Sequence, residues 1–216
     1  MLNQKQSNLI YNLATSNQIS DVNNDLIVYF DPSFYNKKQS DYIFEQLLKQ
    51  VEYDKKSSVM MFGKDVLIPR KQAGYGDDNT TYSFSGITVK SRKWIPILHK
   101  IKTDVEKITG HQFNFCLVNY YENGSQYIGY HRDDENDLVA EPWIASISFG
   151  QKRKFYFKSI DPTLDVVKLN LTHGSLCVMI DPTNANWKHS VPKQSTATSP
   201  DPRINLTFRM IINDYQ

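Results

Sequence analysis

The chain has 216 residues, 40% of them hydrophobic and 12% aromatic, so it can bury one sizeable core and is too apolar to be disordered throughout. Its two cysteines are too few for a disulfide framework or a cysteine-based zinc site, and no apolar run approaches the roughly 20 residues of a membrane span. The formal net charge of +2 selects no class of partner. We therefore expect a soluble, intracellular, single-domain protein that uses no membrane.

The first part of the chain predicts a leader followed by two helices. Residues 1–24 are rich in Asn, Gln and Ser, so we expect a flexible leader there and a single domain over residues 25–216. Apolar residues at helical spacing predict an amphipathic helix over 40–53, with Ser40 as its N-cap. A second helix is expected to begin near Pro96 and to end before Gly110.

The segment between these helices, residues 55–93, is basic and aromatic. It contains eight basic and three acidic residues, interleaved with Phe and Tyr. Such a composition is typical of a surface that contacts phosphates and stacks on bases. An ordinary solvated surface with core aromatics explains the composition about equally well.

From Phe113 onward the pattern changes to short strand-like runs separated by turn signals. The runs cover residues 113–121, 143–149, 153–158, 166–171, 175–180 and 204–212. Many short strands after two helices predict an α+β, mainly β fold: a double-stranded β-helix, or jelly roll, with the N-terminal helices packed on one sheet. The open end of such a fold is a common location for a metal site.

One pair of residues has the spacing of metal ligands. His131 and Asp133 are two residues apart, so on an extended segment their side chains point to the same side. With one more histidine they would form the two-histidine, one-carboxylate set that suits non-haem Fe(II). The triplet alone is weak evidence, because a surface histidine beside acidic residues is common.

The third ligand is not fixed by spacing. The remaining histidines are His99, His111, His173 and His189. His99 and His111 lie on or just after a predicted helix, which favours surface positions. His173, in a predicted turn, is a rival to His189, whose neighbours in the chain are Trp187 and Val191 and predict a buried strand.

The last predicted strand carries a polar row. Arg203, Asn205, Thr207 and Arg209 alternate with Ile204, Leu206 and Phe208, so on a strand they occupy one face. Two guanidinium groups inside a β-sheet core require an anionic partner, because desolvating them is costly. A dicarboxylate such as 2-oxoglutarate would satisfy both. If the strand is half exposed, the arginines point into water instead.

These motifs together resemble the AlkB family of Fe(II)/2-oxoglutarate dioxygenases, and within it the members that repair duplex DNA in the nucleus. The resemblance runs from about Val59 to Met210 and rests on ordered blocks. The blocks are Phe62-Gly63-Lys64, Ile68 to Ala73, Thr81 to Gly86, Phe113-Asn114-Phe115, Asn119-x-Tyr121, Ile128 to Glu135, Ile144 to Gly150, His173 to Leu176, and Arg203 to Arg209.

The resemblance implies the metal ligands and the co-substrate residues. It favours His189 over His173 as third ligand, because the Pro182-Thr183-Asn184 block and Trp187 precede it. It implies an oxidative demethylase that uses Fe(II), O2 and 2-oxoglutarate, with ascorbate as reductant in vitro, and releases formaldehyde and succinate. The residues implied to hold 2-oxoglutarate are Asn119, Tyr121, Arg203, Thr207 and Arg209, supported by Asn205.

The resemblance also implies a nucleotide-recognition lid over residues 55–93 and base flipping. N1-methyladenine and N3-methylcytosine are cations, so their pocket should be aromatic and acidic. Phe62 would be a finger that fills the place of the flipped base, so that Phe62→Ala loses more duplex than single-strand activity; a core anchor is its blander interpretation. The implied substrate residues are Phe62, Gly63, Lys64, Arg70, Tyr82, Ser83, Phe84, Asp134 and Glu135, with Lys71 beside the backbone.

One departure bears on the partner. The duplex-acting members carry a basic run after the last ligand, whereas residues 193–200 here keep one cation. Fewer phosphate contacts weaken duplex binding, so an enzyme acting on single strands or RNA is an alternative. A non-catalytic nucleic-acid-binding module and a zinc hydrolase are further alternatives, although the zinc enzyme leaves Arg203 and Arg209 unexplained. We expect a monomer that binds alkylated DNA, in the nucleus if the source is eukaryotic.

Overall fold

The structure is a computed structural model that describes residues 18–54, 58–61, 64–84, 87–133, 135 and 137–212. The helices are the 3-10 turn η1 Val22–Asn24, α2 Lys37–Gln50, α3 Pro96–Thr109 and α4 Thr183–Asn186. The strands are β1 Gln18–Asp21, β2 Leu26–Asp31, β3 Ser58–Met61, β4 Lys64–Leu67, β5 Lys71–Gly76, β6 Thr81–Phe84, β7 Ile87–Lys90, β8 Arg92–Lys93, β9 Phe115–Tyr121, β10 Ile128–His131, β11 Ile144–Gly150, β12 Arg153–Ser159, β13 Val167–Leu171, β14 Ser175–Ile180, β15 Trp187–Val191 and β16 Arg203–Arg209.

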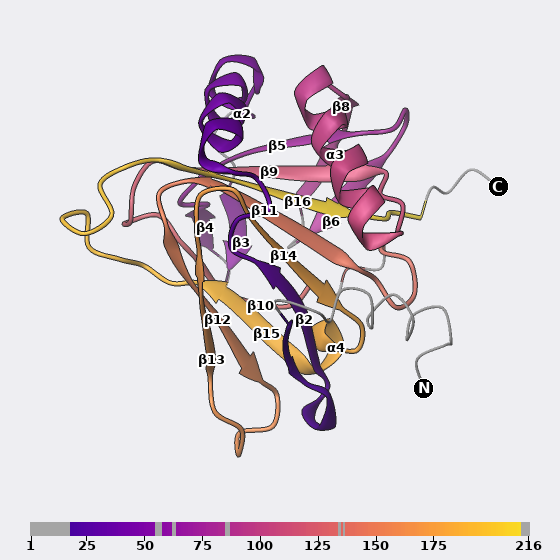
Figure 1. Cartoon of the computed structure of the whole chain (residues 1–216), viewed down its shortest axis with the longest axis vertical. Coiled ribbons are helices and arrows are strands. Elements are labelled where there is room, and N and C mark those ends of the chain that lie inside the picture. The colour runs from indigo at the N-terminus through magenta and orange to yellow at the C-terminus, as the bar shows by residue number, and fades with distance from the viewer. Residues whose placement is uncertain are drawn as a thin grey trace.

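Two sheets form the body of the protein. The larger has eight strands in the order β1-β2-β14-β11-β16-β9-β5-β8, and the smaller has four in the order β10-β15-β12-β13. The β3–β4 and β6–β7 hairpins form two further two-stranded sheets. Figure 1 shows α2 and α3 above the large sheet, with the four-stranded sheet below it. This is the predicted jelly roll with helices packed on one sheet.

The two long helices form where their end signals lie. Asn36 and Gln39 make a capping box that starts α2, and the helix ends where Val51 becomes extended. Pro96 occupies the first turn of α3, and Gly110 ends that helix with φ of 68°, a conformation that glycine adopts without strain. Each helix directs its apolar residues toward the sheet.

An apolar cluster fills the space on each side of the large sheet. The cluster under the helices includes Leu47 of α2, Leu98 of α3 and Leu206 of β16, all fully buried. The cluster between the two sheets includes Val28 and Phe157. Because both faces of the large sheet are covered, the polar side chains of its inner strand β16 are removed from water. None of the helices in the described part of the chain has the length and apolar content of a membrane span.

Two predictions at the start of the domain were wrong. Residues 18–24, assigned to the leader, form β1, which pairs with β2, and the turn η1. The rest of the predicted leader, residues 1–17, lies outside the described residues. Ser40 is not the N-cap of α2: it is buried inside the helix and donates a hydrogen bond to the carbonyl of Tyr35 at 3.2 Å. The helix therefore begins earlier than the apolar spacing indicated.

The segment over residues 55–93 is not one structural unit. Strand β5 pairs with β9 inside the large sheet, and Ala73 and Tyr75 are buried there. The two hairpins before and after β5 are separate from that sheet. Only the hairpins therefore have the position expected of a lid, which stays a prediction.

Candidate metal and co-substrate site

His131, Asp133 and His189 converge. His131 on β10 lies directly opposite His189 on β15 in the sheet register, and Asp133 follows β10 by two residues. Their ligand atoms all lie within 4.8 Å of one another. The Nε2 atoms of the histidines are 3.7 and 4.0 Å from Oδ1 of Asp133. The predicted His-Asp-His convergence is confirmed, and this donor set fits a divalent metal such as Fe(II).

The protonation states also suit metal binding. Burial lowers the pKa of both imidazoles, that of His189 to about 3, so both rings are neutral and can offer a lone pair at neutral pH. Burial is the largest influence on Asp133 and alone would raise its pKa, but the Arg209 guanidinium and the two histidines together outweigh it, and the pKa falls to about 2. The carboxylate is therefore charged without a metal.

A side chain that the sequence analysis did not identify holds the Asp133 backbone. The Asn184 side-chain oxygen accepts a hydrogen bond from the Asp133 amide at 3.0 Å, and its nitrogen donates to the Asp133 carbonyl. Asn184 is buried in the short helix α4, which leads directly into β15 and its ligand His189. The Pro182-Thr183-Asn184 block, which implies His189 as the third ligand, is the sequence signal that contains Asn184.

The polar row on β16 is buried as predicted. Arg203, Asn205, Thr207 and Arg209 are at most 8% exposed, while Leu206 and its apolar neighbours face the helix side. Asn205 donates to Ser146 Oγ at 2.8 Å and to the Ile147 carbonyl at 2.9 Å. The half-exposed alternative for this strand is thereby excluded.

The two arginines keep buried donors without acceptors. Arg209 Nη2 donates to Asp133 Oδ2 at 2.6 Å and Arg203 Nη2 to Ser148 Oγ at 2.9 Å. Within the described residues, Nε and Nη1 of both guanidinium groups have no hydrogen-bond partner. Leaving buried donors unpaired is costly. A small diacid would supply acceptors to both, so these residues fit 2-oxoglutarate.

Asn119 and Tyr121 of β9 lie beside this row. β9 pairs with β16, which places Asn119 opposite Asn205 and Tyr121 opposite Arg203. The Arg203 guanidinium lies 5.1 Å from the centre of the Tyr121 ring. The residues that the resemblance implies for 2-oxoglutarate are therefore neighbours in the structure, and their role in binding it stays a proposal.

Arg70 contacts Asn119, one of the residues expected to bind 2-oxoglutarate. Its Nε donates to Asn119 Oδ1 at 2.8 Å, and Gln72 Nε2 donates to the same oxygen at 2.9 Å. These two bonds fix the orientation of the Asn119 amide. Gln72 was not identified from the sequence, and the contact of Arg70 with the DNA backbone stays a prediction. Lys71 is exposed and pairs with Glu122 at 3.1 Å.

Tyr82 lies deeper than its predicted role suggests. It is 1% exposed, and its ring lies under the Arg209 guanidinium, whose central carbon is 4.9 Å from the ring centre. Nearby, burial raises the pKa of Glu135, and Glu135 Oε2 has no partner among the described residues. The Ser83 amide donates to Asp137 at 2.8 Å, which ties the β6–β7 hairpin to the loop after Asp133.

Several predicted substrate residues lie outside the described residues. These are Phe62, Gly63 and Asp134, together with the side chains of Lys64 and Phe84, whose backbones belong to β4 and β6.

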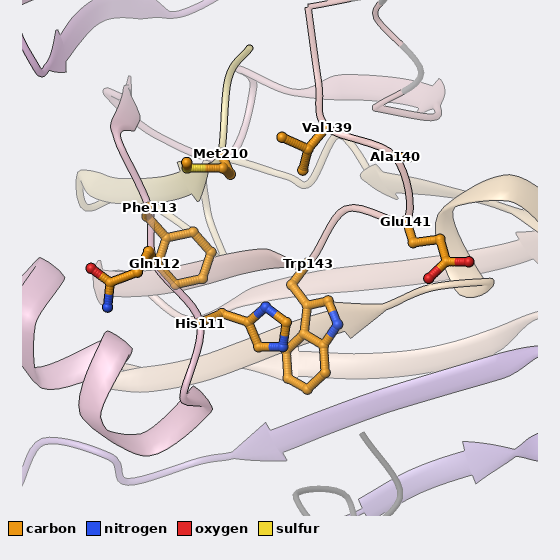
Figure 2. Close-up of a pocket in the computed structure, with 8 residues that line it drawn as sticks. All are labelled: His111, Gln112, Phe113, Val139, Ala140, Glu141, Trp143 and Met210. Atoms are coloured by element: carbon orange, nitrogen blue, oxygen red, sulfur yellow. The ribbon is translucent and has the colours of Figure 1, made fainter. Parts of the chain in front are cut away.

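The rival histidines have other partners. His173 Nδ1 accepts from the Gly150 amide at 2.8 Å, and its Nε2 lies 3.1 Å from Asp41. His111 stacks on Trp143 with ring centres 3.7 Å apart, at the wall of a pocket of about 310 Å³ that shares no residue with the triad (Figure 2). His99 is exposed on α3.

Arg153 is a buried arginine that the sequence analysis passed over. Its Nη2 donates to the carbonyls of Gln126 at 2.8 Å and Pro192 at 2.9 Å, and its Nε donates to Gln194 at 3.2 Å. These bonds join the chain just before β10 to the chain just after β15. Arg153 thus braces the two strands that carry the histidine ligands.

The chain belongs to the 2OG-Fe(II) oxygenase superfamily, whose family model matches residues 27–209, and it is therefore an Fe(II)- and 2-oxoglutarate-dependent dioxygenase. It is 46% identical over 187 residues to the DNA oxidative demethylase ALKBH2 of Homo sapiens. The alignment covers 82% of this chain and 71% of that protein. The Bos taurus protein of the same name is 45% identical, with 82% and 66% covered. These matches confirm the resemblance to the AlkB family.

A solved structure supports the fold independently. The structure of OsALKBH1 superposes with a TM-score of 0.61 at 18% identity and covers 85% of this chain and 97% of that one. At this identity the likeness shows the jelly-roll fold alone.

Proposed function

We propose that the chain is a DNA oxidative demethylase that removes alkyl groups from ring nitrogens, as in N1-methyladenine and N3-methylcytosine. The relatives named above are DNA oxidative demethylases. The observation that carries the proposal is that two buried arginines next to the His-Asp-His set have donors without acceptors among the described residues. The zinc hydrolase alternative does not explain such a pair of arginines.

Each residue of the site would have one task. His131, Asp133 and His189 would hold Fe(II), and with 2-oxoglutarate and O2 bound the metal would supply oxidation of the alkyl carbon, with succinate and formaldehyde as products. Arg203 would bind one carboxylate of 2-oxoglutarate through its planar fork. Arg209, fixed between Asp133 and the Tyr82 ring, would direct its free donors at the other.

The acidic side of the site would favour a cationic base. Glu135 lies near Asp133 and its Oε2 has no hydrogen-bond partner within the described residues, so a methylated base with a positive ring would be better accommodated than a neutral one. His131 is part exposed and would form one face of the base pocket, with the lid residue Phe84 at the other, while Tyr82 is buried against Arg209. The enzyme would work as a monomer on nuclear DNA if its source is eukaryotic.

The test is a methylated oligonucleotide incubated with the protein, Fe(II), ascorbate, O2 and 2-oxoglutarate, and analysed by mass spectrometry. We expect loss of one methyl group per lesion, with formaldehyde and succinate in equal amounts. Omission of 2-oxoglutarate is the control. Activity that survives this omission would support a hydrolase instead, and no demethylation under any condition would support a non-catalytic binding module.

The same assay separates the possible substrates. Matched single-strand DNA, duplex DNA and RNA that carry one lesion each would be compared by initial rate. A DNA oxidative demethylase is expected to favour DNA. If RNA is demethylated faster than both DNA forms, the proposed substrate class is wrong while the reaction type stands.

A further inference from the structure

The outer face of the four-stranded sheet carries only positive charge. None of β10, β12, β13 and β15 contains Asp or Glu. Alternate residues of these strands point away from the core, and their lysines are all exposed. We call this surface the lysine face; its members are Lys154, Lys158, Lys168 and Lys188.

Several lysines elsewhere on the protein have acidic partners. On the helices, Lys37, Lys49 and Lys100 each pair with an acidic residue one turn away, at 2.5 to 2.6 Å. Within the described residues, no member of the lysine face has an acidic partner. The nearest acidic residues in the chain are Asp161 and Asp165, in the loop between β12 and β13.

Two charges of the lysine face also repel each other. Lys158 of β12 lies directly opposite Lys188 of β15, and like charges at opposed positions destabilise a sheet. Two ammonium groups lie over partly exposed rings: Lys158 over Tyr130 at 5.9 Å and Lys168 over Tyr156 at 5.8 Å. Such an arrangement is stabilised when an anion lies across it.

The shape of the lysine face suits an extended anion. Lys154 and Lys158 are separated by four residues along β12, roughly 13 Å at about 3.3 Å per residue. Duplex DNA carries one negative charge per roughly 1.7 Å of its axis, so several phosphates face a row of this length. A single phosphate cannot reach all four lysines, because they follow the strands and do not converge.

The lysine face lies on the reverse side of the strands that carry the histidine ligands. Lys188 directly precedes the ligand His189, and Tyr130 directly precedes His131, so the inner sides of the same two strands carry the metal ligands. The ligand His131 is part exposed on the edge strand β10, so we expect DNA with a base at the metal to pass close to that edge. We propose that the lysine face binds the phosphate backbone of the DNA whose damaged base enters the site, which rests on the proposed function.

The test compares a variant that lacks all four charges of the lysine face with a control variant that lacks four lysine charges elsewhere. One variant carries K154Q, K158Q, K168Q and K188Q; the control carries K38Q, K49Q, K100Q and K107Q, all exposed on α2 or α3. Binding of a short methylated duplex is measured by fluorescence anisotropy over a series of salt concentrations. Circular dichroism checks that both variants keep the fold.

We expect the first variant to bind on the order of 10- to 100-fold more weakly at low salt, with a salt slope shallower by about 0.9 for each phosphate that a lysine no longer neutralises. The control should keep the wild-type slope. Equal affinity and slope in both variants would overturn the proposal. This binding result does not depend on turnover, so absent formaldehyde release by the wild type would overturn the proposed function separately.

A single charge reversal gives a second test. Lys188→Glu creates an opposite-charge pair with Lys158, so the unfolding midpoint should stay equal or rise while duplex affinity falls several-fold. A fall in affinity accompanied by an equal loss of folded protein would instead identify Lys188 as structural and contradict the proposal.

Discussion

The two faces of strand β16 are equally buried, but they differ in how completely their polar atoms are hydrogen-bonded. On the helix side, Leu206 and Phe208 are packed into a continuous apolar cluster. On the other side, Arg203 and Arg209 are also almost fully buried but have donors without acceptors in the part of the chain that the structure describes. Burial alone therefore does not separate a structural face from a functional one. Hydrogen-bond completeness does, because a finished core leaves few polar atoms unpaired.

The strongest test of the polar side removes a metal ligand. His189→Ala should lower demethylation by about a thousand-fold or more, equivalent to about 4 kcal/mol, because only two of the three ligands remain. Formaldehyde release and iron stoichiometry are the measurements. His173→Ala is the control and should keep iron. Normal iron content in the His189 variant would exclude the proposed ligand set.

The corresponding test of the apolar side is a stability measurement. Phe208→Ala should lower the free energy of unfolding by about 3–5 kcal/mol, because it removes a fully buried ring. Denaturant titration gives this value, and the KM for 2-oxoglutarate of the folded fraction should not change. If KM rises as much as for an arginine variant, the two faces of β16 are not independent.

A conservative change sharpens the role of the polar row. Arg203→Lys keeps the charge and loses the planar fork, so the KM for 2-oxoglutarate should rise about 10- to 100-fold with kcat nearly kept. Steady-state kinetics against 2-oxoglutarate measure the split. A drop in kcat at unchanged KM would contradict a binding role for this guanidinium.

The smallest effect is expected for Asn184, which holds the backbone of the ligand Asp133. Asn184→Ala removes both bonds to the Asp133 backbone and should weaken iron binding about 10-fold, because groups that orient a ligand tune its affinity. Iron titration of the metal-free protein measures this affinity. Asn186→Ala in the same short helix is the control. An unchanged iron affinity would make Asn184 a merely structural residue.

The sequence predicted most of the fold after Phe113 because its strands alternate clearly and are bounded by turn residues. Both ends of the second helix were predicted correctly, because Pro96 marks its start and Gly110 marks its end. Strand β5 was missed because its sequence, Lys-Gln-Ala-Gly-Tyr-Gly, has no β-branched residue and becomes a strand only through pairing with β9. The start of α2 was shifted because Asn36 caps it in place of Ser40.

The site was predictable in part for a similar reason. His131, Asp133 and the β16 row follow local spacing that a sequence displays. The choice of His189 needed the family resemblance, because its neighbours Trp187 and Val191 gave only a modest preference over His173. Asn184, Gln72 and Arg153 act on residues far away in the chain, and their partners are known only when the strands are paired.

The opposed positions of His131 and His189 have a consequence for motion. Strand β10 lies at the edge of its sheet and is joined to β15 through a register interrupted by an irregularity. A cation held by both imidazoles would fasten this outermost strand to its neighbour. Amide hydrogen exchange over residues 128–131 would then slow on iron loading, so that backbone dynamics report metal occupancy with no substrate present.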